Sequence, residues 1–118
     1  MRCLIVDDNE TFLGSASRLL ESQGLEVVGR ASSGDEALRL AQTLKPDVAL
    51  VDVQLGEEDG LEVTRQLNAA ARSTPVVLIS THSQEDELAE LITDSRAVGF
   101  LPKTALSAAA IADLLRQR

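Results

Sequence analysis

Short apolar segments alternate along the chain with longer segments in which apolar residues recur every three or four positions. The apolar segments cover residues 3–6, 25–31, 48–51, 76–79 and 98–101. Four of them are nearly continuous apolar runs, which is typical of strands that are covered on both faces of a sheet. Glu26 and Arg30 interrupt the segment at 25–31, and such charges favour an edge strand.

The segments between these strands carry the spacing of amphipathic helices. Four apolar stripes are formed by Phe12, Ala16, Leu19 and Leu20; by Ala37, Leu40, Ala41 and Leu44; by Val63, Leu67, Ala70 and Ala71; and by Leu88, Leu91 and Ile92. A fifth helix is expected over about 106–115. Each of the first four predicted helices has a capping residue near its start: Asn9, Ser33 with Glu36, Asp59 and Ser83. Gly24 and the run at 45–47, which contains Pro46, mark the ends of the first two helices.

This alternation of strands and helices predicts an α/β fold with a parallel sheet. Right-handed crossovers with helices on both faces leave few topologies. The flavodoxin-like strand order 2-1-3-4-5 fits best, because it places the interrupted second strand at an edge. We therefore predict one domain over residues 1–118, with a five-stranded parallel sheet and five helices on its two faces. Ligands in such sheets bind beyond the carboxyl ends of the strands where the winding reverses, here between the first and third strands.

Polar residues that can carry chemistry follow four of the predicted strands. They are Asp7, Asp8, Asp52, Ser80, Thr81 and Lys103. Asp7 and Asp8 follow the first strand and Asp52 follows the third. Ser80 and Thr81 follow the fourth strand, and Lys103 follows the fifth. Because parallel strands end at the same edge of a sheet, we expect the three aspartates to crowd into one shallow site there.

Three carboxylates in one site need a neutralising partner, because each pair about 4 Å apart costs on the order of 4 kcal/mol at an effective dielectric constant near 20. Mg²⁺ suits a site that has few carboxylates and keeps several waters. Lys103 adds a mobile positive charge and Ser80 a hydroxyl donor, so the site could bind a phosphoryl group. Asp52 is then the candidate nucleophile, and Asp7 and Asp8 are candidate metal ligands. Any one of these residues alone would be an ordinary loop or capping group.

Charge and composition weigh against several other classes of protein. Nineteen acidic and eleven basic residues give a net charge of −8, which argues against nucleic-acid contact by this segment, since such binding begins with phosphate neutralisation. The apolar runs are too short to cross a bilayer and no secretory signal is visible, so we expect a cytoplasmic protein with no membrane contact. The one cysteine, Cys3, cannot form an internal disulfide and is expected to be buried.

Five segments together form a specific pattern: LIVDDN at 4–9, PDVALVDVQL at 46–55, DGLE at 59–62, PVVLIS at 75–80 and GFLPK at 99–103. This pattern resembles the receiver domain of two-component response regulators, over essentially the whole chain. The resemblance implies that Asp52 accepts a phosphoryl group from a histidine kinase or a phosphotransfer protein. It also implies that Asp7, Asp8, Asp52 and the backbone carbonyl of Gln54 surround Mg²⁺.

The same resemblance implies a conformational switch. Ser80 would turn toward the phosphoryl oxygens, Lys103 would pair with them, and Phe100 would change rotamer. Phosphorylation replaces one carboxylate charge by roughly −1.5 to −2, which would reshape the surface of the fourth helix, fifth strand and fifth helix. A phosphorylation-dependent homodimer is one expected result. Without a switch, Phe100 would simply be a core residue of its strand.

The chain departs from the family pattern beside the phosphoacceptor. Leu55-Gly56 stands where the family often has Met-Pro, and we expect a more mobile loop there because glycine relaxes the backbone. Thr81 stands where Ala or Gly is usual, and is expected to narrow access to Asp52.

Two further positions have more than one interpretation. Thr104 replaces the usual proline after Lys103, and this leaves the geometry of that peptide bond open, because a cis bond without proline costs about 2.5–4 kcal/mol. His82 is either a surface loop residue or, with Gln54, flanks the path of the water that hydrolyses the acyl phosphate. The acidic residues at 85–87 either favour the start of the fourth helix or meet a basic surface of a partner.

The GFLPK segment is similar to receivers that are joined to a C-terminal helix-turn-helix domain, so we expect a transcriptional output and a chain that is the N-terminal part of a longer regulator. The alternatives are a stand-alone receiver that acts through protein contacts and a small Mg²⁺-dependent phosphohydrolase. The phosphohydrolase would carry Asp-x-Asp after the first strand, whereas Asp7 and Asp8 are adjacent. A degenerate receiver would lack an aspartate or the lysine, and neither is missing. We therefore expect no enzymatic activity beyond the domain's own phosphorylation and dephosphorylation.

Overall fold

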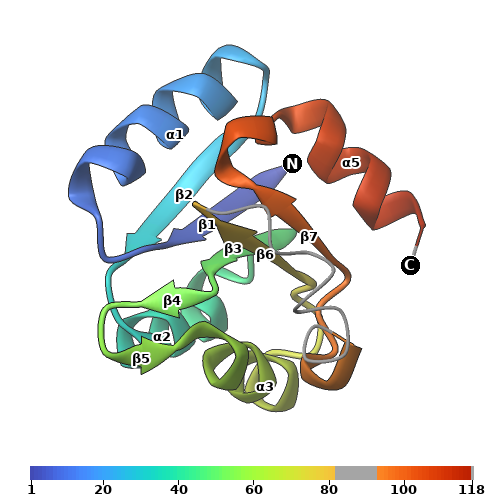
Figure 1. Ribbon diagram of the computed structural model, residues 1–118. Helices are drawn as coiled ribbons and strands as arrows, with labels where there is room; N and C mark the ends of the chain where they lie inside the picture. The colour runs from blue at the N-terminus through green and yellow to red at the C-terminus, as the bar shows by residue number, and fades with distance from the viewer. Residues whose placement is uncertain (82–92, 118) are drawn as a thin grey trace.

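The central element of the computed structural model is a five-stranded parallel sheet (Figure 1). The structure describes residues 1–81 and 93–117. The strands of this sheet are β1 (Arg2–Val6), β2 (Glu26–Ala31), β3 (Val48–Asp52), β6 (Val76–Ser80) and β7 (Gly99–Pro102), in the order β2-β1-β3-β6-β7. Counted along the chain within the sheet, this is the predicted order 2-1-3-4-5, with the interrupted strand β2 at one edge.

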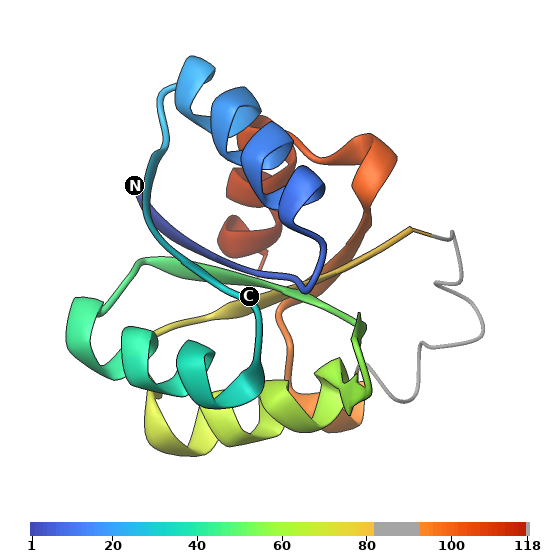
Figure 2. The same cartoon turned by 90° about the vertical axis from the view of Figure 1, so that its left-hand side faces the viewer.

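Helices cover both faces of the sheet (Figure 2). Helices α1 (Glu10–Ser22) and α5 (Ala108–Arg116) pack on one face, and α2 (Gly34–Leu44) and α3 (Gly60–Ala70) pack on the other. A short 3₁₀ helix, η1 (Lys103–Ala105), follows β7. The predicted fourth helix, its stripe at 88–92 and its cap Ser83 lie outside the described residues.

Alternate residues of the inner strands enter two separate cores. Leu4 and Val6 pack toward α2 and α3, whereas Cys3 and Ile5 pack toward α1 and α5. Strands β3 and β6 are buried along their whole length. This two-sided burial explains why the sequence shows continuous apolar runs rather than alternation.

The apolar stripe of α1 differs from the predicted one. Leu19 is 40% exposed, and the buried face is instead formed by Leu13, Ala16, Ser17 and Leu20. Ser17 can lie inside because its hydroxyl donates to the Leu13 carbonyl at 2.6 Å. In α3, likewise, Ala70 is exposed although the stripe predicted it inside.

The predicted helix caps are confirmed at three described positions. The side chains of Asn9, Ser33 and Asp59 accept hydrogen bonds from backbone N–H groups in the first turns of α1, α2 and α3. Gly24, with φ of +97°, follows the end of α1. Helix α5 begins two residues later than predicted, because Ser107 caps it by accepting from the Ala110 N–H at 3.0 Å.

The segment after β3, where we expected a loop, forms a small hairpin, and its greater mobility stays a prediction. Strands β4 (Gln54–Leu55) and β5 (Glu58–Asp59) pair antiparallel around Gly56, whose φ is +60°. Leu55 is buried, and the Glu58 carboxylate accepts the Gly34 N–H at 3.1 and 3.2 Å. These contacts join the hairpin to the start of α2.

The peptide bond after Lys103 and the lengths of the helices are two further features of the backbone. The peptide bond between Lys103 and Thr104 is trans, which closes the question that the missing proline left open. Within the described part of the chain, no helix combines the length and the apolar character needed to cross a membrane.

Candidate functional site

A cavity of about 280 Å³ lies at the carboxyl ends of the parallel strands. Its lining consists of Asp7, Asp8, Asn9, Asp52, Gln54, Gly56, Ser80, Thr81 and Lys103. Strands β1 and β3 are neighbours, with Val6 paired to Val51, so the residues that follow them meet where the winding of the sheet reverses. The predicted rim residues are therefore brought together, and Asn9 and Gly56 join them although the sequence did not assign them to the site.

Three carboxylates crowd into this cavity. One oxygen each of Asp7, Asp8 and Asp52 lies within 4.8 Å of the others. Backbone N–H groups hold the two buried carboxylates: Asn9 donates to Asp7 Oδ1 at 2.8 Å, and Gln54 donates to Asp52 Oδ1 at 3.0 Å. Asp8 is exposed and forms the solvent side of the group.

Lys103 places its ammonium between the two buried carboxylates. Its Nζ lies 2.6 Å from Asp7 Oδ2 and 3.1 Å from Asp52 Oδ2. Burial acts to lower the pKa of Lys103, but the bonds and charges of Asp7 and Asp52 outweigh it and raise the pKa. The lysine therefore remains a cation, and among the described residues that line the cavity it is the one basic side chain beside three carboxyl groups.

Asp52 is held in a setting that disfavours its charged form. Burial is the main cause that raises its pKa, and the charge of Asp7 adds to it; the Gln54 N–H and Lys103 oppose the rise without cancelling it. Additional positive charge in the cavity would therefore stabilise the Asp52 carboxylate.

The donor set of the cavity fits a hard divalent cation. Carboxylate oxygens are the ligands that Mg²⁺ prefers, and the open side next to Asp8 leaves room for waters. Asp7 Oδ2 is buried, and within the described part of the chain it is balanced by its ion pair with Lys103. An oxygen in that condition is a suitable ligand for a cation.

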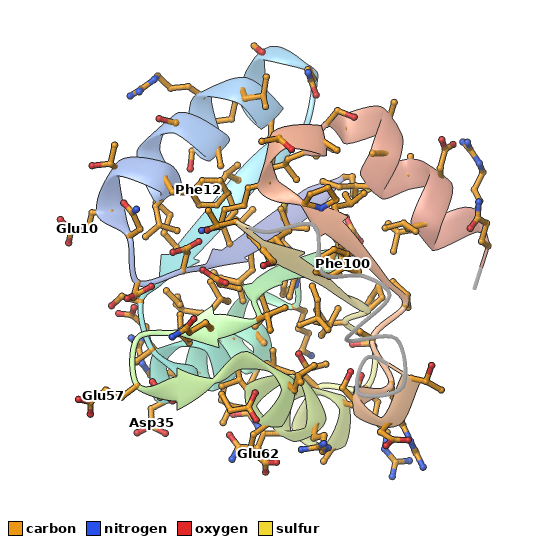
Figure 3. All side chains as sticks on the ribbon, viewed as in Figure 1. Glu10, Phe12, Asp35, Glu57, Glu62 and Phe100 are labelled. Atoms are coloured by element: carbon orange, nitrogen blue, oxygen red, sulfur yellow. The ribbon has the colours of Figure 1, made fainter. Side chains whose placement is uncertain are left out.

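Of the other residues predicted for the site, Ser80 lies at the cavity and Phe100 does not. Ser80 ends β6, is 8% exposed and lines the cavity beside Thr81. Phe100 (labelled in Figure 3) lies on β7, is 7% exposed and belongs to the core shared with α2 and α3, not to the lining of the cavity. His82 lies outside the described residues.

Gly60 lies next to the site, against the backbone of Asp52, and its role there was not predicted from the sequence. A Cβ at this position would lie 1.8 Å from the backbone oxygen of Asp52, so that only glycine allows α3 to start so close to the phosphoacceptor candidate. Its N–H donates to the Val53 carbonyl at 2.8 Å. The signal in the sequence is the Asp59-Gly60 pair, in which the aspartate caps the helix and the glycine permits the contact.

A larger cleft, of about 570 Å³, lies beside the C-terminal half of α3. Its charged lining is Arg65, Arg72, Asp94 and Arg96. With a single carboxylate among the described residues of its lining, it lacks the ligands for a hard cation. The smaller acidic cavity is the better candidate because its chemistry is specific.

The fold and the acidic cavity together define a flavodoxin-like α/β domain with a candidate cation site at the reversal of its sheet. The family model described as "Response regulator receiver domain" matches residues 3–116, and the chain belongs to this family.

Several individual proteins are similar to this chain. The transcriptional regulatory protein LiaR of Bacillus subtilis is 37% identical over 117 residues, which are 98% of this chain and 54% of that protein. The chain thus spans about half the length of the curated relatives that it matches.

Two solved structures extend the comparison. The signal receiver domain of the putative response regulator NarL from Mycobacterium tuberculosis has a TM-score of 0.85 at 32% identity, with 99% of this chain and 97% of that chain covered. A response regulator protein from Burkholderia pseudomallei, solved with a phosphorylated aspartic acid, a calcium ion and citrate, has a TM-score of 0.82 at 29% identity, with 96% and 65% covered.

Proposed function

We propose that this chain is a phosphorylatable receiver, in which Asp52 accepts a phosphoryl group from a histidine kinase or a phosphotransfer protein. The observation that carries the proposal is the position of the Asp52 carboxylate, which lies in the group of three carboxylates and 3.1 Å from the Lys103 ammonium. The phosphorylated aspartic acid and calcium ion named for the Burkholderia relative support the same chemistry.

The transfer step follows from the roles of the side chains. An oxygen of the Asp52 carboxylate attacks the phosphorus of the donor, and the bond from phosphorus to the donor breaks, so that the donor leaves with the electron pair. The Lys103 ammonium offers a point charge to the phosphoryl oxygens. The Ser80 hydroxyl, at the edge of the same cavity, donates to a second oxygen.

Asp7, Asp8, Asp52 and the backbone carbonyl of Gln54 would hold Mg²⁺. When bound, the ion neutralises the carboxylates and the oxygens of the transferred group. Gln54 and Thr81 are exposed and line the cavity, and together with His82 they would control the access of water to the acyl phosphate.

The output follows from the same site. Phosphorylation would draw Ser80 inward and let Phe100 change rotamer, reshaping the surface of the fourth helix, β7 and α5 for a homodimer or another protein contact. The relative LiaR is a transcriptional regulatory protein, which supports transcription as the process controlled. The output would act in the cytoplasm, and the net charge of −8 favours DNA contacts outside this segment.

The test is phosphorylation by a small donor. The protein is incubated with Mg²⁺ and phosphoramidate, and its intact mass is measured over time. The wild-type chain should gain one phosphoryl group and Asp52→Asn none, while Asp8→Asn should gain it more slowly. Uptake by Asp52→Asn at the wild-type rate would contradict the assignment.

A further inference from the structure

The Lys103 ammonium has a third neighbour that carries no charge. Its Nζ lies 4.1 Å from the centroid of the Phe12 ring, well inside the roughly 6 Å range of a cation–π contact. The lysine side chain is only 14% exposed, so that little water competes for the ammonium. Figure 3 shows Phe12 between α1 and the carboxyl ends of the strands. The ammonium is thus enclosed by two carboxylates and one ring face.

The turn that carries the carboxylates also fixes the ring. Asp7 Oδ1 accepts the Asn9 N–H at 2.8 Å, and Asn9 Oδ1 in turn accepts the N–H of Phe12 at 3.1 Å. Phe12 is half-buried and packs against the core between the sheet and α1. The ring therefore keeps its place relative to Asp7 and Asp8 through two consecutive hydrogen bonds.

The three neighbours of the ammonium respond differently to a bound cation. A divalent ion held by Asp7 and Asp52 would compete with Lys103 for the same carboxylates, and the attraction of both to the lysine would weaken. A hard cation prefers oxygen ligands, so the ring face stays available to Lys103. The four-carbon stem of lysine is flexible, and without the ring it could place the ammonium in many other positions.

We propose that Phe12 is a positioning residue: its ring holds the Lys103 ammonium over Asp52 when a divalent cation occupies the carboxylates, ready for the incoming phosphoryl oxygens. This inference rests on the proposed function for its kinetic consequence, whereas the contact between ring and ammonium can be tested without phosphorylation.

The contact is tested by NMR of the Lys103 side chain. Protons above a ring face are shifted upfield, so the ε-methylene protons of Lys103 should be displaced upfield in the wild-type protein and in Phe12→Tyr. The displacement should persist at saturating Mg²⁺ and disappear in Phe12→Leu. An ordinary lysine shift in the wild-type protein with Mg²⁺ would overturn the proposal.

The kinetic consequence is tested with phosphoramidate at saturating Mg²⁺. A cation–π contact in a poorly hydrated site predicts a rate roughly three- to thirtyfold lower in Phe12→Leu, with the wild-type rate retained in Phe12→Tyr. The Mg²⁺ affinity should be the same in all three proteins, because Phe12 supplies no ligand. Ala16→Gly, which weakens the same helix without touching Lys103, controls for lost stability and should keep the wild-type rate.

Pentafluorophenylalanine at position 12 gives the sharpest comparison. It keeps the shape of the ring but reverses the quadrupole that attracts a cation. It should therefore slow phosphoryl transfer by the factor expected for Phe12→Leu, and it still tests the contact if the leucine variant fails to fold. Equal rates in the wild-type and fluorinated proteins would overturn the proposal and leave Asp52 as the phosphoacceptor. A wild-type chain that takes up no phosphoryl group would instead remove the proposed function, and the NMR result would still decide on the contact.

Discussion

Cys3 and Asp52 are both buried at strand positions, and burial raises the pKa of each by disfavouring its charged form. The consequences differ. For Cys3, the raised pKa keeps an apolar neutral thiol in the core. For Asp52, it leaves a reactive carboxylate in need of positive charge, which Lys103 supplies only in part. The same physical effect thus produces a structural residue at one end of the sheet and a chemical one at the other.

Cys3 predicts an alkaline loss of stability. Its pKa is raised from 9.0 to about 12 in the folded protein, so between these values the native state keeps a proton that the unfolded chain releases. The free energy of unfolding should therefore fall as pH rises through this window, by roughly 1.4 kcal/mol per pH unit from this group. Denaturant unfolding at several alkaline pH values measures the slope. Cys3→Ala should show a shallower slope, and equal slopes in the two proteins would contradict the account.

Asp52 predicts a stabilising substitution. Because its folded-state pKa is raised, its contribution to stability is fully present below the unfolded value of 3.8 and is lost as pH rises through the folded pKa. At neutral pH without divalent cations, Asp52→Asn should therefore melt at a higher temperature than the wild-type protein. Mg²⁺ should raise the melting temperature of the wild type more than that of the variant. Glu21→Gln, at an exposed position of α1, should change neither quantity; a lower melting temperature for Asp52→Asn would refute the prediction.

At the scale of elements, the start of α3 and the β4–β5 hairpin lie directly against the end of β3, the strand that carries Asp52. Gly60 lets α3 touch the backbone of Asp52, and Glu58 joins the hairpin to α2 through the Gly34 N–H. Neither contact could be predicted from periodicity. The hairpin strands have two residues each, too few to show a pattern, and the Gly60 contact joins backbones that only the folded chain brings together.

Gly60→Ala should damage both stability and site. The added Cβ would meet the Asp52 carbonyl oxygen at 1.8 Å, and the helix start must shift, at a cost of about 3 kcal/mol or more. Chemical denaturation measures the loss, and phosphorylation by phosphoramidate should slow in the same variant. The matched control is Gly14→Ala in α1, where the nearest atom would be 3.8 Å away; it should stabilise the protein by about 0.5–1 kcal/mol. Equal stabilities of the two variants would show that the contact at Gly60 is absent.

Two adjacent leucines test the corrected face of α1. Leu20 is fully buried and Leu19 is 40% exposed. Leu20→Ala should lower the free energy of unfolding by about 2–5 kcal/mol, and Leu19→Ala by less than about 1 kcal/mol. Urea denaturation of both variants gives the comparison, and similar losses would contradict the packing described. The sequence pattern missed this face because it counts only apolar residues, whereas Ser17 is buried with its hydroxyl bonded to the helix itself.

At the scale of the molecule, the order of the strands and the acidic edge could be predicted because both depend on simple rules. Continuous apolar runs identify strands that are covered on two faces, and parallel strands must present their following residues at one edge. Asp7, Asp52 and Lys103 meet there as predicted. What the sequence could not predict is how side chains from different elements touch, such as the ring of Phe12 and the ammonium of Lys103. That contact joins a residue of α1 to a residue that follows β7, which lie far apart in the sequence.

The central claim is that Asp52 is the residue that receives the phosphoryl group. The most direct measurement is peptide mapping by tandem mass spectrometry of the wild-type chain after incubation with phosphoramidate and Mg²⁺. The account predicts a phosphoryl group on the peptide that contains Asp52, at that residue alone. A phosphoryl group found instead on Ser80, His82 or another residue, with Asp52 unmodified, would contradict it.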